Sequence, residues 1–291
     1  MDKDFFNLLK EKSHGFSKGQ KLIAAYIATS YDKAAFMTAN KLGKTVGVSE
    51  STVVRFAADL GFDGYPSMQR AMQEMVLNRL TSVQRIEVAS NRIDSQDVLA
   101  SVLHSDMDKL RQTLETADRQ AFDAAVDAVV RARSVYIIGV RSTAPLASFF
   151  GYYLNYMLRN VHIVTASGTG EMFEQIVGVS AEDVVIAFSF PRYGASTLKA
   201  AEYCRSVGAK VIAVTDKQQS PLCPFADHAI CAKSDMVSLV DSLVAPLSVV
   251  NALIVAIAAK KETEVHRTFE TLEHIWDQYH VYEKQVTTND L

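Results

Sequence analysis

A short stretch of the sequence, residues 41–65, has the pattern of two helices joined by a tight turn. Gly47 stands where the first helix would end, because glycine readily adopts the left-handed backbone of a helix terminus. Ser49 then suits the amino-terminal cap of a second helix that would run to Leu60. This pattern constrains the fold strongly, since a helical hairpin of this size can place its second helix in the major groove of DNA.

The second helix of the hairpin divides into an inward and an outward face. Val53, Phe56 and Leu60 recur at helical spacing, so we expect them to point into a core. The candidates for DNA contact are the cap and three outward residues, namely Ser49, Ser51, Thr52 and Arg55. Short hydroxyls and an arginine suit phosphates and base edges. The alternative is an ordinary helical hairpin with no role in DNA binding.

The whole chain has room for two folded units. Its 291 residues are enough for two separate cores, and its apolar content of 48% is that of an ordinary globular protein. The net charge of −3 argues against a protein that coats nucleic acid by charge alone. Residues 1–77 carry ten Lys or Arg and eight Asp or Glu, a local excess of two that supports DNA binding only weakly.

The hydrophobic pattern changes from helical to strand-like beyond residue 130. Five short apolar runs are predicted strands, at residues 134–140, 161–164, 183–190, 210–215 and 228–232. Helices are expected between the first four runs, at residues 143–158, 170–178 and 195–207. Continuous apolar strands that alternate with helices predict an α/β fold, a five-stranded parallel sheet covered by helices on both faces. Two further helices are expected over residues 238–260 and 262–279.

We therefore expect three parts in the chain: an all-α helix-turn-helix domain over residues 1–77, a linker with a connecting helix over 78–105, and the sheet domain over 106–285. The polar, aperiodic stretch 81–94 suits the linker, and Ser95 is expected to cap the connecting helix.

One uncharged segment, residues 242–259, is near the lower length limit of a membrane span. It contains a proline, two serines and an asparagine, so we expect a buried helix rather than a membrane partner. This segment and the helix over residues 95–115 are the candidate elements of a dimer interface.

Polar residues gather at two predicted turns from a strand into a helix. They follow the first and the third strand and comprise Arg141, Ser142, Thr143, Ser189, Arg192 and Ser196. Hydroxyls and free N–H groups at a helix amino terminus form an anion site, and a guanidinium can bind an oxyanion bidentately. Since ligands sit beyond the carboxyl ends of parallel strands, we expect a phosphate or carboxylate of a small molecule here. The alternative is that the hydroxyls only cap helices and the arginines face solvent.

The sequence holds no dinucleotide fingerprint, P-loop, H-E-x-x-H or G-x-S-x-G motif. The three cysteines, Cys204, Cys223 and Cys231, have no metal spacing. We therefore expect no metal or cofactor. Reduced thiols and an amino terminus without a secretory signal indicate a cytoplasmic protein.

Both halves of the chain resemble RpiR/MurR-type bacterial transcription regulators. Residues 38–69 are similar to their helix-turn-helix domain, and residues 135–147 and 184–216 are similar to their sugar-isomerase (SIS) domain. The resemblance covers roughly residues 5–280. It implies that Ser49–Leu60 is a recognition helix and that the SIS domain binds a phosphosugar or a related sugar acid.

The ligand turns depart from the family pattern. The resemblance matches Ser142 and Thr143 to a hydroxyl pair after the first strand, and Ser189 to the first serine of an S-x-S-G-x-T loop. Pro191 stands where that loop has its second serine, and Gly194 where it has its threonine. Two hydroxyl donors are therefore missing, which leaves open whether the ligand carries a phosphate. Arg141 and Arg192 are the residues that could compensate.

The function implied is regulation of sugar metabolism. We expect a homodimer or higher homo-oligomer that binds double-stranded operator DNA and responds to an anionic sugar. Effector, operator and direction of control stay open. A structural DNA-binding protein is disfavoured by the near-neutral charge and the large sheet domain.

An enzymatic alternative is a phosphosugar aldose-ketose isomerase, which needs a general base beside the ligand. The candidate bases are Glu171, Glu174, His162 and His228. Both histidines begin predicted strands, at the end of the sheet opposite the ligand turns, so we expect them to be structural. An isomerase would also have no use for residues 1–77, and we therefore expect no enzymatic activity.

Overall fold

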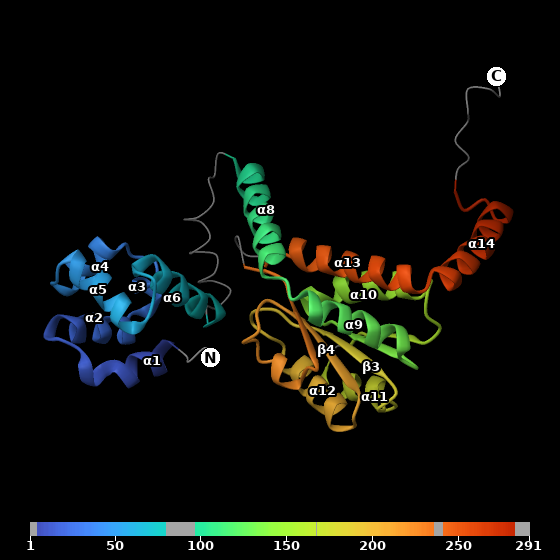
Figure 1. Ribbon diagram of the computed structural model, residues 1–291, viewed down its shortest axis with the longest axis horizontal. Helices are drawn as coiled ribbons and strands as arrows, with labels where there is room; N and C mark the ends of the chain where they lie inside the picture. The colour runs from blue at the N-terminus through green and yellow to red at the C-terminus, as the bar shows by residue number, and fades with distance from the viewer. Residues whose placement is uncertain (1–4, 80–96, 167, 236–240, 283–291) are drawn as a thin grey trace, which may run out of the picture. The chain divides into compact units, whose positions relative to one another are not determined.

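The computed structural model describes residues 5–79, 97–166, 168–235 and 241–282. The chain forms two compact units, residues 1–92 and 93–291 (Figure 1). The expected linker stretch and Ser95 lie outside the described residues.

The amino-terminal unit is all-helical in its described part. Its α-helices are α1 (Phe5–Lys12), α2 (Lys18–Thr29), α3 (Tyr31–Ala34), α4 (Ala39–Val46), α5 (Glu50–Leu60) and α6 (Tyr65–Arg79). Caps fix where the helices begin: the side chain of Thr38 accepts from the backbone N–H of Lys41 at 3.2 Å, and Ser17 forms a capping box with Gln20. The core gathers fully buried side chains from several helices, among them Ile23, Ile27, Leu42, Phe56, Met68 and Met72.

Helices α4 and α5 form the predicted hairpin. Gly47 ends α4 with a φ of 77°, and Gly61 ends α5 with a φ of 98°. A Cβ atom at Gly43 would lie 2.8 Å from the backbone oxygen of Val48, so the absence of a side chain there lets the two helices meet closely.

The carboxy-terminal unit has the predicted α/β architecture. Its strands are β1 (Val135–Ile138), β2 (Val161–Val164), β3 (Val184–Phe188), β4 (Lys210–Thr215) and β5 (His228–Cys231). Its helices are α8 (Val98–Thr116), α9 (Arg119–Arg131), α10 (Ala144–Leu154), α11 (Thr169–Ile176), α12 (Ala195–Ser206), α13 (Val244–Lys260) and α14 (Glu262–Gln278). All strand pairs are parallel, in the order β2-β1-β3-β4-β5.

Helices cover both faces of the sheet, as predicted. Alternate strand residues point to opposite faces, so Ile137 and Ile186 pack with α9, α10 and α13, whereas Val185 and Ala213 pack with α11 and α12. Figure 1 shows these two helical layers on either side of β3 and β4.

Several element boundaries differ from expectation, and the starts of α8 and α13 differ most in their physical cause. Helix α8 is capped by Asp97, whose carboxylate accepts from the N–H of Ala100 at 2.9 Å, so Asp97 and not Ser95 holds the cap position. Helix α13 begins at Val244 rather than at 238. Local hydrophobicity located these helices but could not place their ends.

Helix α13 is largely buried against the sheet through residues such as Val250, Leu253 and Ile257. Among the described helices, none is by itself long and apolar enough to cross a membrane. Helices α13 and α14 reach that length and composition only together, and the chain bends by 97° between them.

Candidate functional site

The strand order brings the two predicted ligand turns together. The chain passes from β1 outward to β2 and then returns to the other side of β1 with β3, so the carboxyl ends of β1 and β3 form the switch point of the sheet. The turn after β1 contacts the end of β3, since the hydroxyl of Thr143 lies 3.5 Å from the backbone oxygen of Phe188. A crevice for a small ligand is expected at this position in open parallel sheets.

Close backbone packing shapes the first turn. A Cβ atom at Gly139 would lie 2.6 Å from Cβ of Ala147 and 2.8 Å from the backbone oxygen of Thr143. Only glycine fits there, and the chain therefore folds directly from β1 into α10. Arg141 and Ser142 are left exposed at the rim of the turn.

The hydroxyls of the two turns differ in whether they have hydrogen-bond partners within the protein. Thr143 is buried and its hydroxyl donates to the backbone oxygen of Val140 at 2.9 Å, so it acts in the fold of the turn. Ser189 and Thr197 are 3% and 1% exposed, and neither hydroxyl has a hydrogen-bond partner among the described residues. Buried hydroxyls without partners are rare and call for water or a ligand. Ser196, beside Thr197, is half-buried.

Both arginines of the site have a backbone conformation that favours glycine. Arg141 has a φ of 57° and Arg192 a φ of 64°, and His280 is the only other described non-glycine residue with positive φ. Arg192 occupies the position at which the S-x-S-G-x-T pattern has its glycine. Left-handed backbone costs a non-glycine residue on the order of 1–3 kcal/mol and is concentrated at functional sites.

The loop that carries Arg192 is anchored by a hydrogen bond to the buried carboxylate of Asp216. The hydroxyl of Tyr193 donates to Oδ1 of Asp216 at 2.8 Å, and the hydroxyl of Thr215 lies 3.2 Å from the same oxygen. Burial raises the pKa of Asp216. Burial and the neighbouring Asp216 also raise the pKa of Tyr193, which therefore stays protonated as the donor. Sequence reasoning missed Asp216, because its role depends on packing between the end of β4 and the loop after β3.

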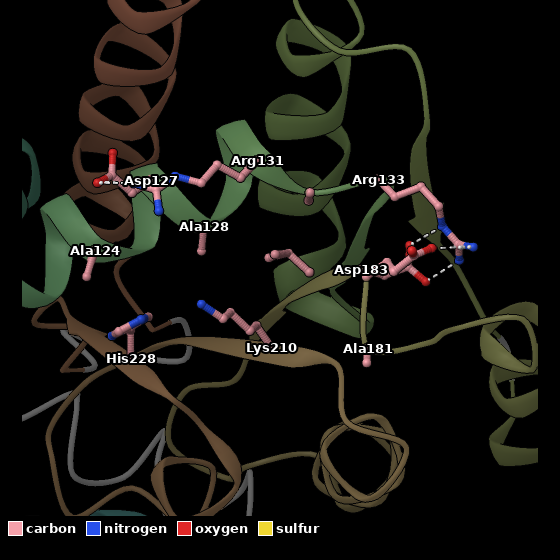
Figure 2. Close-up of a pocket in the computed structure, with 12 residues that line it drawn as sticks. Ala124, Asp127, Ala128, Arg131, Arg133, Ala181, Asp183, Lys210 and His228 are labelled. Carbon is pink, nitrogen blue, oxygen red and sulfur yellow. Dashed lines mark hydrogen bonds and ion pairs between the residues drawn. The ribbon is translucent and has the colours of Figure 1, made fainter.

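A groove of about 630 Å³ opens at the other end of the sheet, where β3, β4 and β5 begin (Figure 2). Two pairs of its charged side chains interact: Arg133 donates to buried Asp183 at 2.7 and 3.0 Å, and Arg131 lies 3.1 Å from Asp127. Burial alone raises the pKa of Asp183, but hydrogen bonds from Arg133 and Ser180 outweigh it and hold that pKa below its usual value. These contacts tie strand starts together, and we assign the groove a structural role.

Two of the four candidate bases of an isomerase lie near the amino ends of their strands, at the edge of the sheet opposite the two turns. His228 begins β5 and lines the groove at the amino ends of the strands. His162 lies near the start of β2, where its ring stacks on Tyr136 with centroids 4.5 Å apart. Glu171 and Glu174 are exposed on α11, with Glu171 in its first turn.

The predicted DNA-contacting residues share the amino-terminal end and the outer face of α5. Ser49 caps α5 and accepts from the N–H of Thr52 at 3.3 Å, and its hydroxyl lies 2.9 Å from that of Ser51 and 2.8 Å from that of Thr52. Ser51 and Arg55 are exposed, whereas Thr52 is half-buried. The structure adds Val54, which is 42% exposed on the same outer face. Its position three residues after Ser51 was the available signal in the sequence.

A lysine of α2 lies close to the same helix end. A Cβ atom at Gly19 would lie 3.3 Å from Cγ1 of Val48 and 3.4 Å from Cγ2 of Thr52, so α2 begins against the turn. The exposed Lys18 directly precedes Gly19. The start of α2, which carries this lysine, therefore lies beside the amino terminus of α5, where a helix favours phosphate.

Known protein families match both units of the chain. The helix-turn-helix domain of the rpiR family matches residues 3–78, and the SIS domain matches residues 129–256. A helix-turn-helix transcriptional regulator from Clostridium perfringens is 25% identical over 216 residues, which cover 74% of this chain and 76% of the relative. YfhH from Escherichia coli K12, a regulator of the same type, is 23% identical over 232 residues, covering 76% and 79%.

Solved structures share the fold. The sugar isomerase domain of an RpiR transcription factor from Sphaerobacter thermophilus superposes with a TM-score of 0.59 at 28% identity, covering 61% of this chain and 99% of that one. Vibrio vulnificus NanR, solved in complex with ManNAc-6P, covers 92% of this chain and 97% of its own, with a TM-score of 0.56 at 22% identity.

A helical domain with a DNA-reading hairpin, joined to a SIS domain, defines a transcription regulator of two parts. The chain belongs to the RpiR-type helix-turn-helix regulators.

Proposed function

We propose that the affinity of this regulator for operator DNA is set by a phosphorylated or otherwise anionic sugar bound at the turns after β1 and β3. The observation that carries the proposal is the pair of buried hydroxyls of Ser189 and Thr197, which lack partners among the described residues. The oxygens of a phosphate accept hydrogen bonds from such hydroxyls. The phosphosugar bound in the complex of NanR, a protein of the same fold, supports this class of ligand.

We assign roles to the remaining residues of the site from their positions in the two turns. Arg141 and Arg192 supply positive charge, and Ser142 and Ser196 supply hydroxyls at the starts of α10 and α12. Arg192 replaces donors that Pro191 and Gly194 cannot provide. Thr143 shapes the first turn rather than binding directly, because its hydroxyl already donates to the backbone. The tyrosine behind the loop, Tyr193, holds Arg192 in position.

A thermal-shift screen of sugar phosphates and matching unphosphorylated sugars tests the ligand class. We expect stabilisation by at least one phosphorylated sugar, and weaker or no stabilisation by its unphosphorylated form. No shift with any anionic sugar would contradict the proposed site.

We propose further that Ser49, Ser51, Thr52 and Arg55 contact operator DNA, together with Val54 and Lys18. Arg55 suits a guanine edge, and the exposed methyls of Val54 suit the methyl group of thymine. Lys18 and the amino end of α5 suit phosphates. We propose that the regulator acts as a homodimer in the bacterial cytoplasm. Dimeric helix-turn-helix proteins with two-fold symmetry bind two DNA half-sites about one helical turn apart.

Replacing Arg55 with Ala tests the DNA-binding face. Loss of a bidentate base contact costs about 1–3 kcal/mol, so we expect operator affinity to fall roughly 5- to 150-fold at fixed salt. Effector binding by the SIS domain should be unchanged, which is the internal control. Equal operator affinity of wild type and variant in a gel-shift titration would refute the assignment.

We propose no catalytic role for the SIS domain. Proton transfer between adjacent carbons needs a base within hydrogen-bond reach of the substrate, and His162 and His228 stand near the amino ends of their strands. Incubation with a panel of aldose and ketose phosphates, followed by chromatography, should show no interconversion. Interconversion that persists in a homogeneous preparation would favour the isomerase alternative.

A further inference from the structure

A second cavity, of about 290 Å³, adjoins the groove at the strand starts and shares Ala132 and Arg133 with it. This amino-edge cavity is lined by the segments directly before β1 and β2 and by residues 261 and 264, where α13 passes into α14. Its volume is at the lower end of the range of small-molecule sites, about 300–1,000 Å³. The cavity therefore has room for an inorganic anion or a small metabolite.

Strand pairing brings the polar residues of this cavity together. The starts of β1 and β2 are adjacent, because the N–H of Val135 donates to the backbone oxygen of Asn160 at 2.9 Å. The side-chain amide of Asn160 in turn donates to the backbone oxygen of Arg133 at 3.1 Å. Ser134 and Arg159 lie in these two joined segments and therefore line the same cavity.

One hydroxyl of the cavity lining is buried without a partner. Ser134 is 8% exposed, and its backbone oxygen accepts from the N–H of Val184 at 3.0 Å. Its hydroxyl has no hydrogen-bond partner among the described residues. A buried hydroxyl in this state calls for a water molecule or a ligand. Because Ser134 lines the cavity, an acceptor bound there is the candidate partner.

Positive charge predominates in the lining, which holds Arg133, Arg159 and Lys261 against one carboxylate, Glu264. Arg133 is already paired with the two carboxylates directly before β3, and Nζ of Lys261 lies 3.2 Å from Glu264. The exposed side chain of Arg159 has neither an ion pair nor a hydrogen bond within the described part of the chain. A guanidinium without a carboxylate partner, close to a lysine, favours an oxyanion.

We propose that the amino-edge cavity binds a small oxyanion, either inorganic phosphate or the phosphate group of a small monoester. Arg159 and the hydroxyl of Ser134 donate hydrogen bonds to it, and Lys261 supplies a second positive charge. An oxyanion held in this way ties the 97° bend between α13 and α14 to the starts of β1 and β2.

The amino-edge cavity is separate from the two turns after β1 and β3. Strand β1 is four residues long, so its start and its end lie on the order of 13 Å apart. Occupancy of one site therefore does not block the other. The inference stands independently of the effector proposed for the two turns.

Chemical protection of Arg159 tests the site directly in the full-length chain. Phenylglyoxal modifies accessible arginines, and mass spectrometry reads the rate at each position. With ionic strength held constant by sodium chloride, inorganic phosphate at about ten times its dissociation constant should slow modification of Arg159 about 10-fold. Arg119, an exposed arginine of α9 outside the cavity, should react at an unchanged rate. An equal rate at Arg159 with and without phosphate would overturn the proposal.

Calorimetric titration of matched variants gives a second readout, with inorganic phosphate and glycerol phosphate as the two probes. Arg159→Ala and Ser134→Ala should raise the dissociation constant of the tighter probe roughly 10-fold or more, whereas Arg119→Ala should leave it unchanged. S134A should unfold at the same urea concentration as wild type, because the hydroxyl that it removes has no partner among the described residues. The tighter of the two probes identifies the source of the oxyanion.

The variants also separate this site from the effector site. Phosphate binding that persists in Arg192→Gly and is weakened in R159A supports the amino-edge cavity. Binding that is lost in R192G and retained in R159A would place the oxyanion at the turns after β1 and β3 and overturn the inference. Protection of Arg159 in a protein that no anionic sugar stabilises would retain this site and contradict the proposed function.

Discussion

At the scale of single residues, the candidate effector site is marked by groups in unfavourable states. Arg141 and Arg192 hold left-handed backbone, and Ser189 and Thr197 bury hydroxyls that find no partner among the described residues. Each state costs free energy in the absence of a ligand. The oxyanion of the proposed ligand would accept hydrogen bonds from the hydroxyls and pair with the guanidinium groups, which would offset these costs.

Substituting Arg192 by Gly and by Ala separates strain from ligand contact. Both changes remove the guanidinium and should weaken sugar-phosphate binding about 10-fold or more, since hydrogen bonds to charged groups contribute about 1.5–3 kcal/mol. Only glycine relieves the left-handed backbone, so R192G should be more stable than R192A by about 1 kcal/mol. Calorimetric titration and urea unfolding measure the two effects. Wild-type affinity in both variants would remove Arg192 from the site.

Asp216 predicts a dependence of stability on pH. Its pKa is raised by burial, so its favourable contribution to folding is fully present below the unfolded pKa of about 3.9 and is lost as pH rises through the folded value. Asp216→Asn does not titrate. The unfolding free energy of D216N relative to wild type should therefore increase from about pH 4 upward and level off above the folded pKa.

Tyr193→Phe provides the matched comparison for this pH profile. It removes a hydrogen bond that lowers the pKa of Asp216, so the loss of stability with rising pH should be steeper than in wild type. Urea unfolding at a series of pH values measures all three proteins. Parallel profiles for wild type and D216N would show that Asp216 is not the responsible group.

At the scale of elements, the close approach of α4 and α5 explains the hairpin. The turn between them has no room for a Cβ atom at Gly43, where Val48 presents its backbone oxygen. The stripe of Val53, Phe56 and Leu60 then packs into the helical core as the periodicity predicted. The contact at Gly43 and the packing of the inward stripe of α5 together determine where the outer face of α5 lies.

Replacing Gly43 with Ala should force α4 and α5 apart. Overpacking of this kind costs about 1–3 kcal/mol, and operator affinity should fall because the outer face of α5 is displaced. Thr45→Ala is the control, because Thr45 is exposed on the same helix and should change stability by no more than about 0.5 kcal/mol. Chemical denaturation and operator titration measure the two properties. Wild-type stability of G43A would mean that the helices can separate without cost.

At the scale of the whole molecule, the helix-turn-helix domain and the SIS domain belong to different units of the chain. Coupling between them requires that the effector bind two states of the regulator with different affinity.

Reciprocity offers a quantitative test of this coupling. If saturating sugar phosphate changes operator affinity by a given factor, saturating operator must change sugar-phosphate affinity by the same factor, typically about 5- to 150-fold. Fluorescence anisotropy and calorimetry can measure the two factors independently. No change of operator affinity with a ligand that demonstrably binds would refute effector control.

Local pattern was sufficient for the elements of this fold. The runs 161–164 and 210–215 were predicted with their observed bounds, because parallel strands buried on both faces are continuous apolar segments. The cap of α5 was predicted at Ser49, where a single hydroxyl decides the start of the helix. The start of α8 was not, since Asp97 and Ser95 are both good caps and the sequence does not choose between them.

The sequence by itself determined the two units, the helical hairpin and the parallel sheet, because each depends on spacing along one segment. Only the tertiary structure decided that β1 adjoins β3, which brings together two turns about 50 residues apart in the chain. It also decided that Arg192 is left-handed, that Ser189 is buried, and that α8 turns its leucines outward. These properties arise from contacts between segments distant in sequence, which periodicity within a segment cannot encode.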